Sequence, residues 1–294
     1  MDAADLRVFE AVARLGGMNR AAAELNTVQS NVTTRIRRLE DELGTALFER
    51  HSRGVTPTPA GLRLLPYAGR VGELLATARR ATADDGWPKG PLTVGSLETT
   101  AALRLSPVLT AYVAAWPEVD LMLRTGTTAE LIEAVLERTV EGAFVAGPID
   151  HPELDRTAMF AEELAIATAP GIETLDELTH KAALKLVVLR AGCSYRQRLE
   201  AILAGRGIVG LRQLEFGTID AIVSCVAAGL GVTLLPVGIL EPPHQAGRLT
   251  MHRLHRDEAR VETLFIRRRD GFLSSAMRTF LEIARSPRTG ARNF

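Results

Sequence analysis

The stretch NTVQSNVTTRIRRLE, residues 26–40, carries hydroxyl, amide and guanidinium side chains where an ordinary surface helix would mix in Glu and Lys. Apolar residues recur through it at the spacing of one face of an α-helix: Val28, Val32, Ile36, Leu39 and Leu43. Asn26 or Thr27 can cap this helix, and Gly44 can end it. The pattern predicts a long helix with a polar, basic face that carries no acid before Glu40.

Shorter elements flank this helix on both sides. Upstream, residues 6–15 have an amphipathic pattern, a Gly-Gly pair breaks it, and Asn19 can cap a short second helix that ends at Leu25. Downstream, residues 47–58 indicate two short extended segments around an Arg-Gly turn, which is typical of a small β-wing. Helix, short helix, turn, long helix and wing together predict an all-α winged helix-turn-helix domain.

The side chains of the long helix suit the major groove of DNA. Gln and Asn can form paired hydrogen bonds with adenine, and Ser and Thr can donate or accept, whereas Asp and Glu at these places would repel phosphate. The chain has 35 basic and 35 acidic residues, so no global positive field attracts nucleic acid and any DNA binding must be local. The alternative is a solvated polar helix face, which would not account for the preceding helices and the wing.

Residues 20–61, RAAAELNTVQSNVTTRIRRLEDELGTALFERHSRGVTPTPAG, resemble the N-terminal domain of LysR-type transcriptional regulators. The resemblance implies double-stranded promoter DNA as the partner, with Arg35 and Arg50 holding phosphates and Arg53 at the wing tip entering or flanking the minor groove. The residues expected to contact DNA are Thr27, Gln29, Ser30, Asn31, Thr33, Thr34, Arg35, Arg50 and Arg53.

Residues 59–83 predict a further helix, with apolar residues at helical spacing: Leu62, Leu65, Ala68, Val71, Leu74, Leu75 and Ala78. Because an apolar stripe on a helix outside any domain needs another chain to cover it, this segment predicts a dimerising linker helix, with a kink or a weak first turn at Pro66. The alternative is a helix packed on its own domain. The turn residues of DDGWPKGP, residues 84–91, favour the linker because they are typical of a hinge.

Short apolar runs alternate with helical segments from residue 91 onward. The runs are LTVGS, VDLMLRTG, GAFVAG, LAIATA, LKLVVLR, LRQLEF and GVTLLP. Such alternation predicts an α/β domain with parallel strands, in which ligands bind where loops leave the carboxyl ends of strands and meet helix N-termini. The loops at those ends are rich in small and hydroxyl residues.

The run FGTIDAIVSCVAAGLGVTLLP, residues 216–236, resembles the C-terminal half of the same family, a two-lobed, periplasmic-binding-protein-like (type 2) α/β effector domain. The resemblance implies an unidentified small-molecule effector between the lobes, no cofactor, and a homodimer or homotetramer, with RNA polymerase as a further candidate partner. The residues expected to line the cleft are Ser96, Leu97, Thr127, Gly147, Cys193, Ser194, Tyr195 and Thr218. Taken singly, each could equally be a turn or N-cap residue.

The patterns and the resemblance together divide the chain into three parts. Residues 1–58 are expected to form the winged helix-turn-helix domain, with the helix-turn-helix at 18–37 and the wing at 47–58. Residues 59–88 form the linker helix and hinge. Residues 89–294 form the effector-binding domain, with lobe I from 91–160 and 266–294 and lobe II from 161–265.

Cys193 offers a second interpretation of the effector domain. In GCSYRQRLE it is expected at the N-terminal turn of a helix beside Arg196, where the helix dipole and the guanidinium both favour a thiolate. A thiol-based redox sensor is therefore an alternative, although no second cysteine follows near Ile202, and Cys225 lies in an apolar run typical of a buried residue. VLRAGCSYRQRLE and VQSNVT resemble a subgroup that includes regulators of cell division and of sulfur oxidation.

Other classes of protein fit the sequence less well. The candidate acids and bases Glu98, Asp150, His151 and Asp220 lack the spacing of a catalytic set, and the six His residues are scattered, so we expect neither an enzyme nor a metal site. A solute-binding or metabolite-converting α/β protein is the alternative from another class, and residues 1–61 argue against it. No window reaches the roughly 18 uncharged apolar residues of a membrane span, so a cytoplasmic protein without membrane contact is expected.

Overall fold

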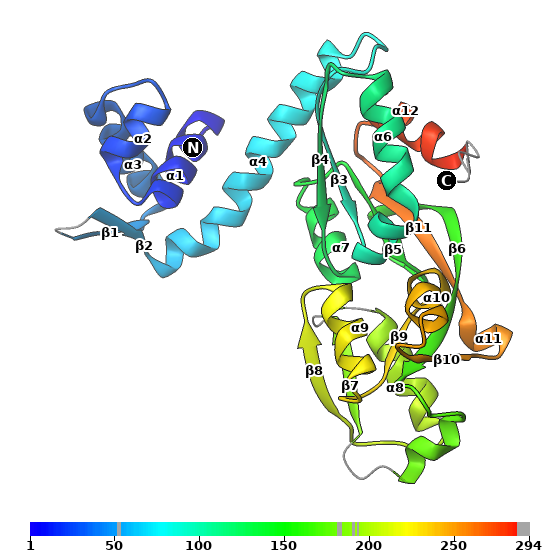
Figure 1. Cartoon of the computed structure of the whole chain (residues 1–294). Helices are drawn as coiled ribbons and strands as arrows, with labels where there is room; N and C mark the ends of the chain where they lie inside the picture. Colours follow the sequence, from blue (N-terminus) through cyan, green and yellow to red (C-terminus); the bar gives the residue numbers. More distant parts are fainter. Residues whose placement is uncertain (52–53, 181–183, 190–191, 193, 287–294) are drawn as a thin grey trace. The chain divides into compact units, whose positions relative to one another are not determined.

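The computed structural model describes residues 1–51, 54–180, 184–189, 192 and 194–286. The chain forms two compact units, Met1–Asp84 and Asp85–Phe294, each with its own hydrophobic core (Figure 1). No helix in the described ranges is both long and apolar enough to cross a membrane.

The N-terminal unit begins with the elements of a winged helix-turn-helix: α1 (Ala3–Leu15), α2 (Met18–Glu24), α3 (Gln29–Leu43), β1 (Phe48–His51) and β2 (Gly54–Pro57). At the start of α1, the Asp2 carboxylate accepts the Asp5 backbone N–H at 2.8 Å, and this hydrogen bond lowers the pKa of Asp2. Gly16 and Gly44, both with a φ of 64°, end α1 and α3 in the left-handed conformation that glycine adopts most readily. The expected winged helix-turn-helix is confirmed.

The core of this unit lies among its three helices and the wing. Val32, Ile36 and Leu39, the middle of the predicted stripe on α3, are fully buried and share one apolar cluster with Phe9 and Phe48. The rings of Phe9 and Phe48 lie 5.2 Å apart between their centroids. Burial of one helix face therefore fixes which side chains of α3 point outward.

The two ends of the predicted stripe are exceptions. Val28 is the N-cap residue of α3 and is 65% exposed, and Leu43 is 40% exposed. Asn26 and Thr27, expected as caps, lie in the turn before α3, and Asn26 has a φ of 51°. Because the chain changes direction there, helical spacing stops predicting burial at Val28.

A carboxylate on α3 joins this helix to the start of the wing. Oε1 of Glu40 accepts the backbone N–H of Leu47 at 2.7 Å and that of Phe48 at 3.2 Å. Two hydrogen bonds to one charged oxygen are stronger than neutral ones, so the segment that begins β1 is held against α3.

α4 (Pro59–Ala83) completes the N-terminal unit, starts at a Thr58 cap and contains Pro66 within it. Its apolar residues divide into two groups. Leu64, Leu65, Ala68 and Val71 pack on the core of the unit. Leu62, Tyr67, Leu74 and Leu75 are exposed. The prediction that another chain covers the whole stripe is therefore wrong for its middle, which the chain's own domain covers.

A seven-stranded sheet, in the order β10-β6-β11-β5-β3-β4 with β9 beside β6, forms the C-terminal unit together with a separate β7-β8 pair. The strands are β3 (Gly90–Ser96), β4 (Val119–Thr125), β5 (Gly142–Ala146), β6 (Leu154–Thr168), β7 (Lys185–Leu189), β8 (Arg212–Phe216), β9 (Thr233–Pro236), β10 (Thr250–Arg253) and β11 (Arg260–Arg268). The expected parallel pairing occurs between β3 and both β4 and β5 and between β7 and β8. It is wrong for β6, which pairs antiparallel with β9, β10 and β11.

Helices cover these sheets and begin where strands end. They are α5 (Glu98–Thr100), the π-helical η1 (Ala101–Leu105), α6 (Ser106–Ala115), α7 (Thr128–Leu136), the 3-10 helix η2 (Leu175–His180), α8 (Ser194–Ala204), α9 (Ile219–Ala227), α10 (Val237–Gln245), α11 (Arg256–Ala259) and α12 (Ser275–Arg285). α5, η1 and α6 follow one another directly, in the region where the sequence predicts a single helix over 99–115.

The C-terminal unit has two lobes joined by β6 and β11 (Figure 1). Phe160 of β6 packs on the cluster of lobe I, which contains Tyr112 and Phe280. Ala165 and Ala167 of the same strand belong to the cluster of lobe II, which contains Ile222 and Leu235. One strand thus serves both cores, and the expected two-lobed α/β architecture is confirmed.

Candidate functional site

The start of α3 presents a polar surface without acids. The predicted DNA contacts in this region are all exposed or half-buried: Thr27, Gln29, Ser30, Asn31, Thr33 and Thr34. Nδ2 of Asn31 donates to Oγ1 of Thr27 at 2.9 Å, which joins the turn to the helix. The first turn of α3 has neither an acidic residue nor a side-chain cap, so its backbone N–H groups can donate to a phosphate oxygen.

The arginines predicted to hold phosphates have different surroundings. Nη1 of Arg35 donates to Oδ1 of Asp5 at 2.8 Å, and the Asp5 side chain is fully buried, so Arg35 already has a structural partner inside the domain. Arg50 is exposed in β1, and Arg53 lies outside the described residues. Arg38, further along α3, is also exposed.

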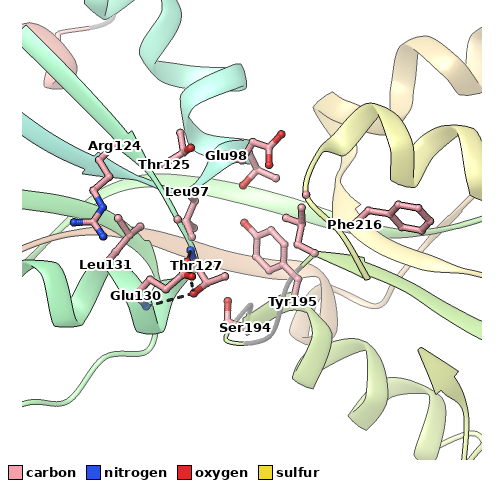
Figure 2. A pocket seen from close by; sticks show the side chains of 14 residues that line it. Leu97, Glu98, Arg124, Thr125, Thr127, Glu130, Leu131, Ser194, Tyr195 and Phe216 are labelled. Atoms are coloured by element: carbon pink, nitrogen blue, oxygen red, sulfur yellow. Dashed lines mark hydrogen bonds between the residues drawn. The ribbon is translucent and has the colours of Figure 1, made fainter. Parts of the chain in front are cut away.

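A cavity of 330 Å³ opens where the two lobes of the C-terminal unit meet. Four residues expected to bind an effector line it: Leu97, Thr127, Ser194 and Tyr195. Figure 2 shows the Tyr195 side chain between Thr127 on one side and Phe216 on the other. Strand ends and helix starts from both lobes thus converge on one space.

Three further residues expected in the cleft do not line this cavity: Ser96, Gly147 and Thr218. Ser96 is buried and its hydroxyl donates to the carbonyl of Leu97 at 2.9 Å, while Oγ1 of Thr218 accepts the Ala221 N–H and caps α9. Cys193 lies outside the described residues. The backbone N–H of Gly147 donates to the carbonyl of Glu262 at 2.8 Å.

Gly147 lines a different groove because the antiparallel strand β11 passes the end of β5 and takes this hydrogen bond. Prediction of a wholly parallel sheet placed the end of β5 beside the ends of β3 and β4. The end of β5 does lie beside that of β3, with which it pairs in parallel, and it is Gly147, beyond the end of β5, whose N–H bonds to β11 instead.

Further lining residues were not among those expected to bind the effector: Glu98, Thr99, Arg124, Thr125, Gly126, Glu130, Leu131, Leu189, Phe216 and Gly217. Glu130 forms a capping box with Thr127, in which its Oε2 accepts the Thr127 N–H at 2.8 Å and the Thr127 hydroxyl at 3.1 Å. The Thr-x-x-Glu spacing is the sequence signal that could have identified Glu130.

The two lobes contact each other beside the cavity at Glu98 and at Gly192. Oε1 of Glu98 in lobe I accepts the N–H of Ile219, the first residue of α9 in lobe II, at 3.2 Å. A Cβ at Gly192, where φ is 95°, would lie 2.8 Å from Oγ1 of Thr127. Glycine is therefore required where the chain before α8 passes Thr127.

Two arginines of the effector domain have hydrogen-bonding partners of their own. Nη1 of Arg124 donates to Oγ1 of Thr139 at 3.2 Å, and Figure 2 shows its guanidinium at the edge of the cavity, away from Tyr195. Nη1 of Arg196 pairs with Glu215 at 2.9 Å. Arg196, the cation expected beside Cys193, is thus shared with Glu215, and the redox alternative stays a prediction.

Comparisons with known proteins agree with both units. Residues 3–62 match the family described as bacterial regulatory helix-turn-helix protein, lysR family, and residues 86–287 match the LysR substrate binding domain. The chain is 41% identical over 276 residues to the HTH-type transcriptional regulator GltR of Bacillus subtilis (strain 168), which covers 94% of this chain and 93% of that protein. It is 37% identical over 282 residues to the HTH-type transcriptional regulator CzcR of Bacillus anthracis, covering 96% of both.

Solved structures share the fold. Full-length CbnR in complex with its target DNA has a TM-score of 0.66 at 24% identity, covering 97% of this chain and 99% of that one. A full-length OxyR variant of Pseudomonas aeruginosa has a TM-score of 0.67 at 21% identity, covering 97% and 95%. The chain therefore belongs to the LysR family of DNA-binding transcriptional regulators, which are not enzymes, and it carries their helix-turn-helix domain and their substrate-binding domain.

Proposed function

We propose that a small molecule bound in the cavity between the lobes controls how this regulator engages promoter DNA. The observation that carries the proposal is the cavity wall, to which both lobes contribute. A ligand that touches both lobes favours one arrangement of them by its differential affinity, and α4 with residues 84–90 connects that change covalently to the DNA-binding unit.

We propose a homodimer or homotetramer as the active form. Four exposed large apolar side chains on α4 support this: Leu62, Tyr67, Leu74 and Leu75. Exposed apolar residues along one helix are stabilised by burial against another copy, and two DNA-binding units in one assembly can bind two half-sites. RNA polymerase is a further proposed partner, and the cytoplasm, where promoter DNA is located, is the proposed compartment.

The proposed DNA contacts are the residues predicted from the sequence, except that Arg35 is given a different main partner. Gln29, Ser30 and Asn31 are assigned to bases or to the adjacent backbone, and Arg50 to phosphate, because these side chains are exposed. Arg35 is assigned first to Asp5. The finer placement among regulators of cell division and sulfur oxidation stays a prediction, since the names of the similar relatives do not refer to either process.

Promoter binding by the full-length chain at two salt concentrations tests the DNA-binding part of the proposal. Affinity for the chain's own upstream region is expected to fall steeply with salt because phosphate contacts release counterions. A change in that affinity, or in the footprint, on addition of one member of a metabolite panel tests effector control. A chain whose promoter binding responds to no metabolite, although it binds promoter DNA specifically, would contradict control by an effector.

Gln29→Ala is expected to weaken specific promoter binding by about 1 to 3 kcal/mol and to relax the preference at one base pair. The exposed amide at the start of α3 is the reason, because it can pair with one base edge. Gel shift with specific and random DNA measures the effect. Arg50→Ala is the matched control, expected to weaken both DNAs equally, and an equal loss on both DNAs for Gln29→Ala would show that Gln29 does not read a base.

A further inference from the structure

The charged side chains that line the inter-lobe cavity, among the described residues, are two carboxylates and one guanidinium, those of Glu98, Glu130 and Arg124. The Arg124 guanidinium is bonded to Thr139 and lies at the edge of the cavity, away from Tyr195 (Figure 2). The wall nearest the centre therefore combines carboxylates with hydroxyl groups. The carboxylates of this wall favour a cationic group on the ligand.

Glu98 is the carboxylate best placed to receive such a group. It is half-buried, and its Oε1 accepts the Ile219 N–H at 3.2 Å, which orients the carboxylate. Its second oxygen, Oε2, accepts no hydrogen bond from any residue that the structure describes. A carboxylate fixed by one hydrogen bond and open at its other oxygen can accept from an ammonium group without reorganising.

The helices that begin around the cavity differ in whether an acidic residue lies in their first turn. α7 has Glu130 in its first turn and α9 has Asp220, whereas α8, which begins at Ser194 in the cavity wall, has no acid there. Of these three helices, only α8 has a positive N-terminal end that no carboxylate of its own first turn neutralises. A ligand carboxylate is most favoured at α8, next to the Ser194 hydroxyl.

The size of the cavity limits the ligand further. Its 330 Å³ lies near the lower end of the range of about 300 to 1,000 Å³ that small-molecule sites span. Leu97, Leu131 and Phe216 supply an apolar part to the wall. The space suits a small metabolite with two charged ends and a short side chain.

We propose that the effector is a small molecule with a protonated amine, in its simplest form an α-amino acid, with its ammonium group on Glu98 and its carboxylate at the start of α8. This assignment rests on the proposed function of the cavity and names the ligand class. Because Glu98 also holds the first residue of α9, an ammonium group on Glu98 connects the ligand to both lobes at one point.

Calorimetry on the full-length chain tests the assignment. The probes are the twenty standard amino acids and, for each that binds, the 2-hydroxy acid with the same side chain and configuration, in which a hydroxyl group replaces the ammonium group. At least one amino acid is expected to bind about tenfold or more tightly than its 2-hydroxy acid, because a charge-assisted hydrogen bond is lost in the hydroxy acid. Equal affinity of the two would overturn the assignment, as would the absence of binding by every amino acid.

The variant Glu98→Gln tests whether the amine of the ligand binds at Glu98. The amide oxygen can still accept the Ile219 N–H, but the charge is gone, so the affinity for the amino acid is expected to fall about tenfold or more while that for the hydroxy acid stays within about twofold. Asp220→Asn is the matched control, since it makes the same change in charge in the first turn of α9 at a residue outside the cavity wall. An equal loss in both variants would show a general effect of charge and overturn the role of Glu98.

The failure of this assignment can be told apart from failure of the proposed function. A metabolite without an amine that binds the chain and changes promoter binding would overturn the amine while leaving effector control intact. Thermal unfolding of Glu98→Gln shows whether the variant is folded. If it is not, the comparison of amino acids with their hydroxy acids on the unaltered chain decides the question alone.

Discussion

A chain carrying both Leu74→Glu and Leu75→Glu is expected to be monomeric and to lose about a hundredfold or more in promoter affinity. Leu74 and Leu75 are 53% and 43% exposed on α4, although both are large and apolar. Burying a glutamate in an apolar contact between copies is strongly unfavourable, so the assembly should separate. A monomer then binds one half-site without the gain that a second, tethered DNA-binding unit provides.

Sedimentation velocity measures the assembly, and gel shift with a complete operator and with a single half-site measures the affinity. The single half-site should bind the variant and the unaltered chain with similar affinity, because the DNA-binding unit itself is unchanged. Thr77→Glu combined with Arg80→Glu adds two glutamates at polar positions of the same helix and should leave the assembly intact. An intact oligomer in the leucine variant would exclude this part of α4 as the dimer contact.

Arg35→Met is expected to lower the free energy of unfolding of the N-terminal unit by about 2 to 3 kcal/mol, because it leaves the buried Asp5 carboxylate without its cation. The Asp5 side chain is fully buried, while that of Arg35 is 35% exposed, so solvent already screens part of the interaction. This places the effect below that of a completely buried pair. We therefore expect Arg35 to stabilise the N-terminal unit through its ion pair with Asp5.

Hydrogen exchange of peptides from α1 and α3 in the full-length chain measures this loss, because these helices carry the two partners. Arg38→Met removes the same charge at an exposed position of α3 and should change the exchange little. Arg35→Met combined with Asp5→Asn should recover part of the stability, since the unpaired charge is also removed. Unchanged exchange in Arg35→Met, with a smaller salt dependence of DNA binding, would instead assign Arg35 to phosphate alone.

Local patterns predicted the N-terminal unit well because its core follows one helical period. Val32, Ile36 and Leu39 are buried where the period places them. The Asp5–Arg35 pair was not predicted, since it joins residues 30 positions apart that no short motif connects. The same holds for Glu98 and Ile219, which are 121 positions apart.

Strand prediction in the effector domain was limited by composition. β11 reads RVETLFIRR, and the first half of β6 also mixes charged residues with apolar ones, so neither forms a continuous apolar run. Of the two, β11 pairs antiparallel with β5, and its Glu262 carbonyl accepts the N–H of Gly147, which lines another groove. Four expected cavity residues nevertheless line the cavity, because Leu97, Thr127, Ser194 and Tyr195 follow strands or begin helices whose positions the sequence did indicate.

Glu40 holds the first residues of the wing against α3 through two backbone hydrogen bonds. The separation between the helix and the wing is thus set before any DNA binds. An operator whose major groove and flanking backbone lie at another separation must bend or change its groove width to fit. The free energy of this deformation depends on base steps that no side chain contacts. We therefore expect the affinity for an operator to depend partly on the stiffness of its flanking sequence. Substitutions of the side chains that contact bases should not change this dependence.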